Sequence, residues 1–425
     1  MRAWSRSASG ALPAVGDLVP FLRDKLGFLE RAARQHGDVV ELALAQRTFL
    51  LAHPIDIAHV LVDNADNYRK SPRIGSSRGQ RVGGVSLITV EGDRHDSLRR
   101  PLLPLMRVGT LQPFVPRIQR EIARVTATWH DGATIDLCAA TRRIALECAI
   151  RLFLGDRLVD SSPQLAESVE IRRRFMLSFY GSLRPWPERW PLALNRRYRR
   201  VSRRMDSVLD ESLAAGDDSL LTLLGAGETP RIADALRGQV FTLLVSAYET
   251  LADHLAWLCF VLAGGEQGEA PLQGEIAAVG RYDSDYADRF LAEVLRLYPP
   301  TWMFVRIARA ADVLPSGATV PSGTKIYLSQ WVTQRDARFF PEPDRFDPSR
   351  FLPEVARQRP RFSYFPFGGG RRHCIGEPLA RLVASQLLAA IVPRWRLELR
   401  TPSIVPVASV TLTPSAPITA VLHSV

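Results

Sequence analysis

Cysteine is scarce in this chain, with 4 among 425 residues, at Cys138, Cys148, Cys259 and Cys374. No two of them have the spacing of a zinc site or of a disulfide framework. The first three lie in apolar helical contexts, which indicates core thiols in a reducing compartment. The N-terminal segment has a basic start but lacks a continuous apolar run, so we expect neither a signal peptide nor a membrane anchor. These absences exclude a disulfide-stapled secreted scaffold and predict a soluble, cytoplasmic protein.

Internal repeats and low-complexity segments are also absent from the sequence, while 46% hydrophobic residues are ample for a core. One apolar segment, 241–263, is long enough to suggest a membrane span. Glu249, Asp253 and His254 interrupt its middle, where charges are costly in lipid. The segment therefore predicts a buried core helix, which the glycines at 264–265 would end.

The segment 367–376, FGGGRRHCIG, is the most informative part of the chain. It places Cys374 in a glycine-rich turn just before an apolar helical run, so a thiolate would lie at a helix N-terminus, where negative charge is favoured. The segment resembles the haem-ligand loop of cytochromes P450, F-x-x-G-x-R-x-C-x-G, with every fixed position filled. The resemblance implies haem b with Cys374 as the axial iron ligand, and such a thiolate favours O–O cleavage. The alternative is a buried structural cysteine.

A second motif pairs Glu293 with Arg296, three residues apart on one helix face, before a Pro-Pro that ends the helix. Alone, such a pair is most often an exposed ion pair of little energetic value. Followed by P-E-P-D-R-F at 341–346 and then by the Cys loop, it resembles the E-x-x-R motif of the same family. The resemblance implies a buried network of Glu293, Arg296 and Arg345 that supports the structure beneath the haem.

A third motif lies inside the predicted core helix, where the sequence S-A-Y-E-T ends at Thr250. It resembles the family's distal motif A-G-x-(D/E)-T, which implies that Glu249 and Thr250 are an acid–alcohol pair delivering protons during oxygen activation. The motif departs from the pattern at Ser246 and Leu251. Ala247 replaces the usual glycine, and its additional methyl group near the oxygen site predicts a tighter groove there. The alternative is a core threonine that hydrogen-bonds to its own helix backbone.

A fourth motif places His95 and Arg99 four residues apart, on one face of a predicted helix. This resembles the family's H-x-x-x-R, whose side chains reach the haem propionates. Two carboxylates call for such donors, because a guanidinium binds a carboxylate through two hydrogen bonds. Arg372, two residues before the cysteine, and Arg306, beyond the Pro-Pro, are further candidates for the same role. For His95 alone, a surface histidine is the alternative.

The resemblance extends over nearly the whole chain and implies one domain, residues 1–425, with the cytochrome P450 fold. That fold is mainly α with small β-sheets, a triangular helical prism that holds haem between the long distal helix and the Cys-loop helix. The residue patterns agree with it. Expected helices lie within 55–62, 111–154 and 194–215, and expected strands within 39–44, 48–51, 318–328 and 403–421. The Gly-, Ser- and Arg-rich stretch 70–90 predicts a loop.

By this resemblance, the protein is a haem-thiolate monooxygenase, an oxidoreductase of secondary metabolism that inserts one oxygen atom of O₂ into an apolar small molecule. The substrate-pocket candidates, placed by the family's recognition regions, are mainly apolar: Leu87, Phe175, Leu243, Leu244, Ala247, Met303, Val305 and Ser409. They suggest hydroxylation of a terpenoid, steroid, fatty-acyl or polyketide-like compound. The alternatives are a peroxide-driven P450, against which Glu249 and Thr250 argue, and a non-catalytic thiolate-haem sensor or binding protein.

No flavin or iron–sulfur domain follows the Cys loop, so we expect electrons from a ferredoxin or flavodoxin with an NAD(P)H-dependent reductase, steered by arginines near that loop. The net charge is +11, and eight arginines lie within 184–204, beside Trp186 and Trp190. For this segment a solvated helix face, a lid over the substrate entrance and a contact with a membrane surface stay open. The sequence has no motif that matches nucleic-acid binding, so we do not expect a nucleic-acid partner. We expect the protein to be a monomer.

Overall fold

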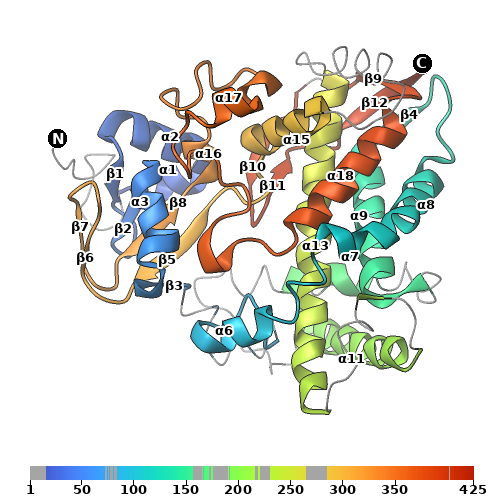
Figure 1. Cartoon of the computed structure of the whole chain (residues 1–425), viewed down its shortest axis with the longest axis horizontal. Helices are drawn as coiled ribbons and strands as arrows, with labels where there is room; N and C mark the ends of the chain where they lie inside the picture. Colours follow the sequence, from blue (N-terminus) through green and yellow to red (C-terminus); the bar gives the residue numbers. More distant parts are fainter. Residues whose placement is uncertain are drawn as a thin grey trace.

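The computed structural model describes residues 16–71, 84–156, 192–215, 230–264, 285–401 and 403–425, together with 74, 76, 80, 165, 167–171, 174–175, 190 and 219–220. In this part of the chain helices predominate, and short strands gather into small sheets (Figure 1). The mainly α architecture predicted from the sequence is therefore present. Trp186, with the rest of 181–189, lies outside the described residues.

The longest helix, α13 (Pro230–Gly264), runs through the molecule and packs against α9 (Leu137–Leu154), α15 (Asp285–Leu297) and α18 (Glu377–Ile391) (Figure 1). From residue 251 to 263 every side chain of α13 except Phe260 is buried, because apolar residues occupy all its faces. This confirms the prediction of a core helix over 241–263. None of the described helices has the length and apolar character needed to cross a membrane.

Shorter helices surround this core. They are α1 (Leu18–Arg23), α2 (Lys25–His36), α3 (Pro54–Ala58), α6 (Gly92–Arg99), α7 (Val108–Leu111), α8 (Val115–Thr126), α11 (Ala193–Ala215), α16 (Gln330–Thr333) and α17 (Pro353–Ala356). A π-helical turn, η1 (His59–Asp63), and the 3-10 turns η2 (Ala65–Asn67), η3 (Gln112–Phe114), η5 (Pro348–Phe351) and η6 (Gly370–Arg372) extend or connect them. Amphipathic spacing explains their packing. In α8, for example, Ile118, Ile122 and Val125 recur on one face and are buried.

The largest sheet has the strand order β1-β2-β8-β5-β3, in which β2 and β8 are parallel and the other neighbours antiparallel. Its strands are β1 (Val39–Leu42), β2 (Thr48–Leu51), β3 (Tyr68–Arg69), β5 (Phe304–Ala308) and β8 (Lys325–Leu328). A second sheet, β4-β12-β9, consists of β4 (Thr134–Asp136), β9 (Trp395–Leu399) and β12 (Thr419–Ser424). Two strand pairs complete the set: β6 (Asp312–Val313) with β7 (Thr319–Val320), and β10 (Pro406–Ala408) with β11 (Leu412–Pro414).

The helices and strands predicted for the described residues agree with this arrangement except in one region. Of the loop predicted at 70–90, residues 72–73, 75, 77–79 and 81–83 lie outside the described residues, and Ile74 and Gln80 are helical. The hairpin expected from 39–51 is β1–β2, and the helix expected at 55–62 is α3 continued by η1. The stretch 111–154, predicted as helical throughout, is instead divided by β4. Gly132, at φ +75°, allows the chain to turn there, and the β-branched Thr134 and Ile135 then pair with β12.

Candidate active site

The Cys loop is a tight turn closed by a hydrogen bond from the Cys374 N–H to the carbonyl of Phe367, 2.9 Å long. Gly368 and Gly370 have φ of +73° and +63°, a conformation that other residues adopt at a cost. A Cβ on Gly370 would lie 2.1 Å from the carbonyl oxygen of Leu61 in η1. Both glycines are therefore required for the loop to fold this closely against the rest of the protein.

Cys374 lies just before α18, and its side chain is exposed. Burial raises the pKa of this thiol, and the backbone N–H groups of Gly376 and Glu377 and the charge of Arg99 oppose that effect. These donors favour a thiolate, as expected at a helix N-terminus. The geometry suits a cysteine that binds a metal through its sulfur.

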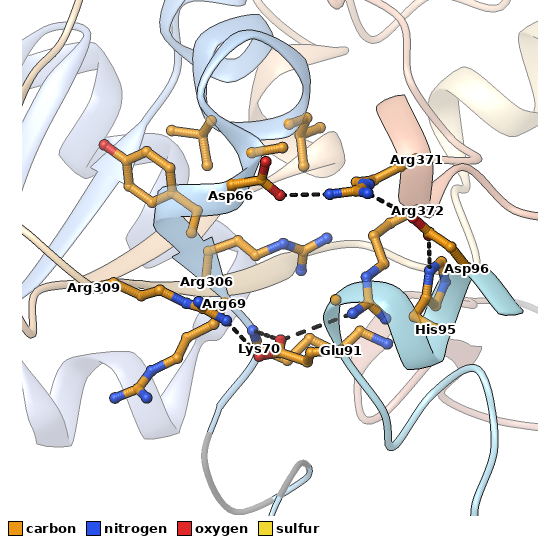
Figure 2. Close-up of a pocket in the computed structure, with 15 residues that line it drawn as sticks. Asp66, Arg69, Lys70, Glu91, His95, Asp96, Arg306, Arg309, Arg371 and Arg372 are labelled. Atoms are coloured by element: carbon orange, nitrogen blue, oxygen red, sulfur yellow. Dashed lines mark hydrogen bonds and ion pairs between the residues drawn. The ribbon is translucent and has the colours of Figure 1, made fainter.

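A cavity of about 160 Å³ opens beside this loop, between η1, β3, β5, α6 and η6 (Figure 2). Its charged lining residues comprise six cations and three carboxylates. The cations are Arg69, Lys70, Arg306, Arg309, Arg371 and Arg372, and the carboxylates are Asp66, Glu91 and Asp96. His95, Arg306 and Arg372, which the sequence predicts as propionate ligands, all line this cavity.

The cations of the cavity are incompletely neutralised. Burial, then the neighbouring Arg372, lowers the pKa of Arg306 to about 10. Burial, followed by the charges of Arg372 and Arg306, lowers the pKa of Lys70 to about 7. An anionic ligand placed here would relieve both effects, since opposite charge favours the protonated forms. This donor set fits a group with two carboxylates, such as haem.

Lys70 is a residue that the sequence motifs missed. Its Nζ donates to the carbonyls of Leu87 and Ile88, at 3.3 and 3.0 Å, and its backbone N–H donates to Glu91, at 2.6 Å. These contacts hold the ammonium group against the cavity (Figure 2). No local pattern could have revealed it, because its partners come from a loop 17 to 21 residues further on.

On α6, His95 and Arg99 have different surroundings. His95 is buried and hydrogen-bonds through Nδ1 to Asp96, at 2.9 Å, while Asp96 also pairs with Arg371, at 2.5 Å. Burial lowers the pKa of His95. Arg99 does not line the described cavity, but its charge interacts with Cys374. The predicted propionate ligand Arg99 is therefore not among the residues that line this cavity.

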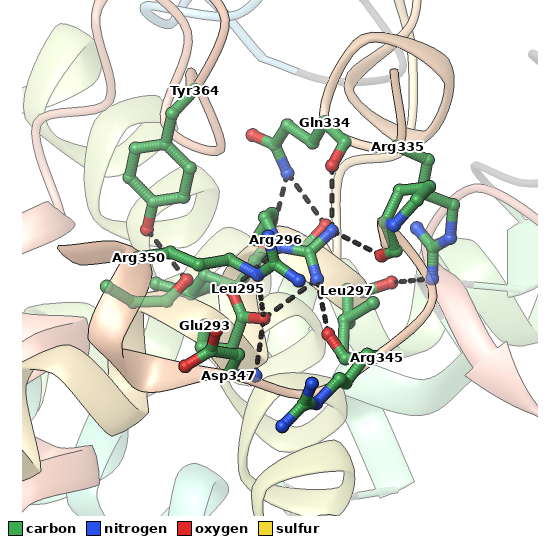
Figure 3. Close-up of polar contacts among 12 residues, drawn as sticks. Glu293, Leu295, Arg296, Leu297, Gln334, Arg335, Arg345, Asp347, Arg350 and Tyr364 are labelled. Carbon is green, nitrogen blue, oxygen red and sulfur yellow. Dashed lines mark hydrogen bonds and ion pairs between the residues drawn. The ribbon is translucent and has the colours of Figure 1, made fainter. Parts of the chain in front are cut away.

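The E-x-x-R pair forms the centre of a buried network (Figure 3). Glu293 and Arg296 are both fully buried, and two hydrogen bonds of 2.7 and 2.8 Å join them. The three remaining N–H donors of Arg296 reach the carbonyls of Gln334, Pro343 and Arg345, at 2.9, 2.7 and 3.1 Å. All five donors of the guanidinium are thus satisfied, which offsets the cost of burying its charge.

The prediction that the Arg345 side chain completes this network is wrong. Only its carbonyl takes part, and its guanidinium is 55% exposed, pairing with the exposed Glu342. The arginine that contacts Glu293 is Arg350, at 3.4 Å and 8% exposed. The Asp347 N–H also donates to Glu293, at 2.9 Å. The turn η5 begins directly after Asp347 and carries Arg350 inward, so the third arginine of the network is five residues later than predicted.

On the distal helix, Glu249 and Thr250 are half-buried on α13, near its midpoint. The Thr250 hydroxyl donates to the carbonyl of Ser246, at 2.6 Å. This is the backbone hydrogen bond that the alternative interpretation of the motif describes. It occupies the hydroxyl proton and leaves the oxygen lone pairs free to accept a hydrogen bond.

The pocket candidates divide into two groups. Leu243 and Leu244 belong to the main hydrophobic core, and Leu87 and Ala247 pack against it. Leu87 is also tied to α13, because its N–H donates to Gln239, at 3.2 Å. The remaining four lie elsewhere. Met303 and Val305 pack against a second core, the Ser409 carbonyl accepts from Trp302, and Phe175 stacks on Tyr198 of α11 at 4.0 Å.

The arginines next to the cysteine are engaged within the protein. Arg371 pairs with both Asp66 and Asp96, at 2.5 Å each, and Arg372 donates to the carbonyls of Leu87 and Val90, at 3.1 and 2.9 Å. Neither projects as an unpaired charge. The expectation that the arginines near the Cys loop steer a redox partner stays a prediction.

Comparison with known proteins identifies the family. The cytochrome P450 family model matches residues 8–419. Cyclooctatin synthase of Streptomyces melanosporofaciens is 31% identical over 93% of this chain and 91% of its own length, and pentalenene oxygenase of Streptomyces avermitilis is 29% identical over 92% and 91%.

Among solved structures, a six-coordinated cytochrome P450 from Thermus thermophilus matches at 26% identity with a TM-score of 0.74, covering 95% of this chain and 99% of that one. The retinoic-acid-bound cyanobacterial CYP120A1 shares the fold, at 22% identity and a TM-score of 0.84 over 99% of both chains. With its cysteine in the ligand loop and a cationic cavity beside it, the chain belongs to the cytochrome P450 family and is a haem-thiolate monooxygenase.

Proposed function

We propose that this monooxygenase hydroxylates a cyclic terpenoid. The single observation that carries this proposal is the similarity to two terpenoid-modifying relatives, cyclooctatin synthase and cyclooctat-9-en-7-ol 5-monooxygenase, at 31% and 30% identity over 93% of this chain. Pentalenene oxygenase, at 29% identity, adds support. The apolar character of Leu87, Leu243, Leu244 and Ala247 agrees with a hydrocarbon substrate, which offers few groups for hydrogen bonding.

Haem, when bound, supplies the activation of oxygen and its transfer to carbon. The chain's own residues would position it. Cys374 would hold the iron through its sulfur, while His95, Arg306, Arg372 and Lys70 would bind the two carboxylates in the cationic cavity. The network around Glu293 would keep the Cys-loop side of the molecule rigid.

Proton delivery would depend on Glu249 and Thr250. Because the Thr250 hydroxyl proton is engaged by Ser246, its oxygen can accept a hydrogen bond and hold a water or reaction oxygen in place. Glu249, the adjacent acid, would exchange protons with the solvent side of α13. Ala247, which stands where the family's motif has glycine, would narrow the groove on this face of the helix.

Electrons would come from a separate acidic ferredoxin or a flavodoxin with its NAD(P)H-dependent reductase. The net charge of +11 supports an acidic partner, because opposite charge accelerates encounter. With Arg371 paired to aspartates and Arg372 turned inward, other exposed arginines of the chain would supply the steering. A cytoplasmic location and a monomeric state are also part of the proposal.

The test is a titration of the purified haem-loaded protein with cyclic terpenes, a steroid and a long-chain fatty acid, read by the shift of the haem Soret band. Turnover of each binding compound with ferredoxin, reductase and NAD(P)H under ¹⁸O₂ then follows. We expect a terpene to shift the band and to give a product containing one ¹⁸O atom. A shift and turnover confined to the steroid or fatty acid would overturn the terpenoid assignment, and turnover with peroxide alone would overturn the redox-partner assignment.

A further inference from the structure

Residues 86–90 form a compact turn whose shape is fixed by its own hydrogen bonds. The N–H groups of Thr89 and Val90 donate to the carbonyl of Ser86, at 2.9 and 3.0 Å. The Thr89 hydroxyl accepts from the Ser86 N–H, at 3.0 Å. Ser86, Thr89 and Val90 are all buried. With its shape fixed in this way, the 86–90 turn is positioned by the groups that hold it from outside.

From one side, the long helix α13 holds the 86–90 turn through Gln239. The Gln239 side chain is buried, and its Oε1 accepts from the Leu87 N–H, at 3.2 Å. Gln239 precedes Thr250 by about three helical turns, so the two residues lie on one face of α13, with Leu243 between them. Gln239 therefore joins the turn to the face of α13 that the substrate is expected to contact.

From the other side, two cations of the cavity hold the carbonyls of this turn. Lys70 donates to the carbonyls of Leu87 and Ile88, at 3.3 and 3.0 Å. Arg372 donates to the carbonyls of Leu87 and Val90, at 3.1 and 2.9 Å. Both cations also line the cavity that fits the two haem carboxylates (Figure 2). Leu87 is thus held by α13 at its N–H and by the cavity at its carbonyl.

The cations that hold the turn repel one another. The charges of Arg372 and Arg306 both act against the protonated form of Lys70, and Glu91 opposes this effect only in part. Two carboxylates in the cavity would cancel this repulsion and keep Lys70 charged, with its full set of N–H donors. The turn should therefore be held more firmly when the cavity contains a dicarboxylate than when it contains an uncharged group.

We propose that the 86–90 turn couples the haem carboxylates to the substrate pocket, and that Gln239 is the positioning residue that carries this coupling to α13. The carboxylates hold Lys70 and Arg372, these two cations hold the turn, and the turn keeps Leu87 in the wall of the pocket. The proposal rests on the haem and pocket positions of the proposed function. It does not depend on the terpenoid assignment, because no step involves the substrate's structure.

The first test compares the full-length protein loaded with haem and with haem dimethyl ester, which lacks both negative charges. Hydrogen–deuterium exchange, resolved to single amides by fragmentation, follows the Leu87 N–H. We expect this amide to exchange about fivefold faster in the ester form, the equivalent of one net hydrogen bond. The buried amide of Ile144 in α9 is the reference and should exchange equally in both forms. Equal exchange at Leu87, or a change no larger than that at Ile144, would overturn the proposal.

The second test removes the contact with α13. Gln239→Leu deletes the acceptor, so the Leu87 amide should exchange about fivefold faster in the haem-loaded protein. Gln239→Glu keeps an oxygen at this position and should restore slow exchange, since the Gln239 Nε2 has no hydrogen-bond partner among the described residues. The control is Gln386→Leu, which deletes an acceptor of the same kind, bonded to Gln119 of α8 at 2.8 Å. It should leave exchange at Leu87 unchanged.

Three results of the second test would overturn the role of Gln239: unchanged exchange in Gln239→Leu, an equal change in Gln386→Leu, or no restoration in Gln239→Glu. The Soret band and haem content of each variant establish that it is folded. If Gln239→Leu does not retain haem, the comparison of haem with its ester in the unmodified protein decides the proposal. Neither test uses a substrate, so a failure of the terpenoid assignment does not affect their outcome.

Discussion

Replacing Arg350 by alanine tests the revised network around Glu293 against the one that the sequence predicted. The Arg350 guanidinium is 8% exposed, lies 3.4 Å from Glu293 and donates to the carbonyl of Glu342, at 2.9 Å. Removing it deletes one buried charge contact with Glu293 and one hydrogen bond to the Glu342 carbonyl, which keeps a second hydrogen bond from the Arg345 N–H, at 3.0 Å. Glu293 keeps its two hydrogen bonds from Arg296. The loss of folding stability in Arg350→Ala should therefore be smaller than the loss caused by breaking the Glu293–Arg296 pair.

The magnitudes follow from these contacts. A hydrogen bond to a charged group contributes about 1.5–3 kcal/mol, so Arg350→Ala should destabilise the protein by about 2–3 kcal/mol. Glu293→Ala leaves the fully buried Arg296 uncompensated, which typically costs about 3–5 kcal/mol. Arg345→Ala removes only an exposed pair with Glu342 and should change stability by less than about 1 kcal/mol.

The assay follows loss of the Soret band with increasing urea, together with the haem-to-protein ratio of each purified variant. Arg345→Ala is the matched control, since it removes the same side chain five residues earlier. We expect its urea midpoint and haem content to equal those of the unmodified protein, with Arg350→Ala lower and Glu293→Ala lowest. If Arg345→Ala lowered the midpoint as far as Arg350→Ala, the assignment of the third arginine would be refuted.

Two further predictions concern the cavity and the distal helix. Because the folded-state pKa of Lys70 is lowered to about 7, below its unfolded value, the folded haem-free protein bears an unfavourable charge below pH 7, which is relieved as the pH rises above 7. Lys70→Met should therefore raise the free energy of unfolding of the haem-free protein in urea at pH 6, and this gain should shrink above pH 7. The variant should also lose haem to apomyoglobin faster than the unmodified protein does. A gain that does not depend on pH, or an unchanged rate of haem transfer, would contradict this prediction. Thr250→Ala and Glu249→Gln should still bind haem but divert NAD(P)H consumption to peroxide, partially for Thr250→Ala and with a larger fall in rate for Glu249→Gln. Product yield per NAD(P)H equal to that of the unmodified protein in both would show another proton route.

Much of the candidate site could be predicted because it depends on short, local motifs. The glycines before Cys374 and the spacing of Glu293 and Arg296 specify local backbone and a shared helix face, which sequence alone reveals. Arg306 and Arg372 were found through their positions relative to these motifs, and the structure places both in one cavity.

The features that the sequence missed or predicted wrongly depend on contacts between distant segments of the chain. Lys70 acts through a loop that reaches it only in the folded protein, and no pattern surrounds it. Arg345 and Arg350 both follow the same proline-rich segment, and which one turns inward is decided by the turn η5. The strand β4 is three residues long and exists because β12 pairs with it, so the helical pattern on either side concealed it.

The absorbance spectrum of the reduced protein with carbon monoxide tests the central claim most directly, that Cys374 binds haem iron as a thiolate. The purified chain should give the red-shifted band that a thiolate ligand produces, and Cys374→His should keep haem while losing that band. Cys148→Ser, at a buried core thiol, should keep the band and serves as the control. An unchanged red-shifted band in Cys374→His, or its absence from the unmodified protein, would contradict the account.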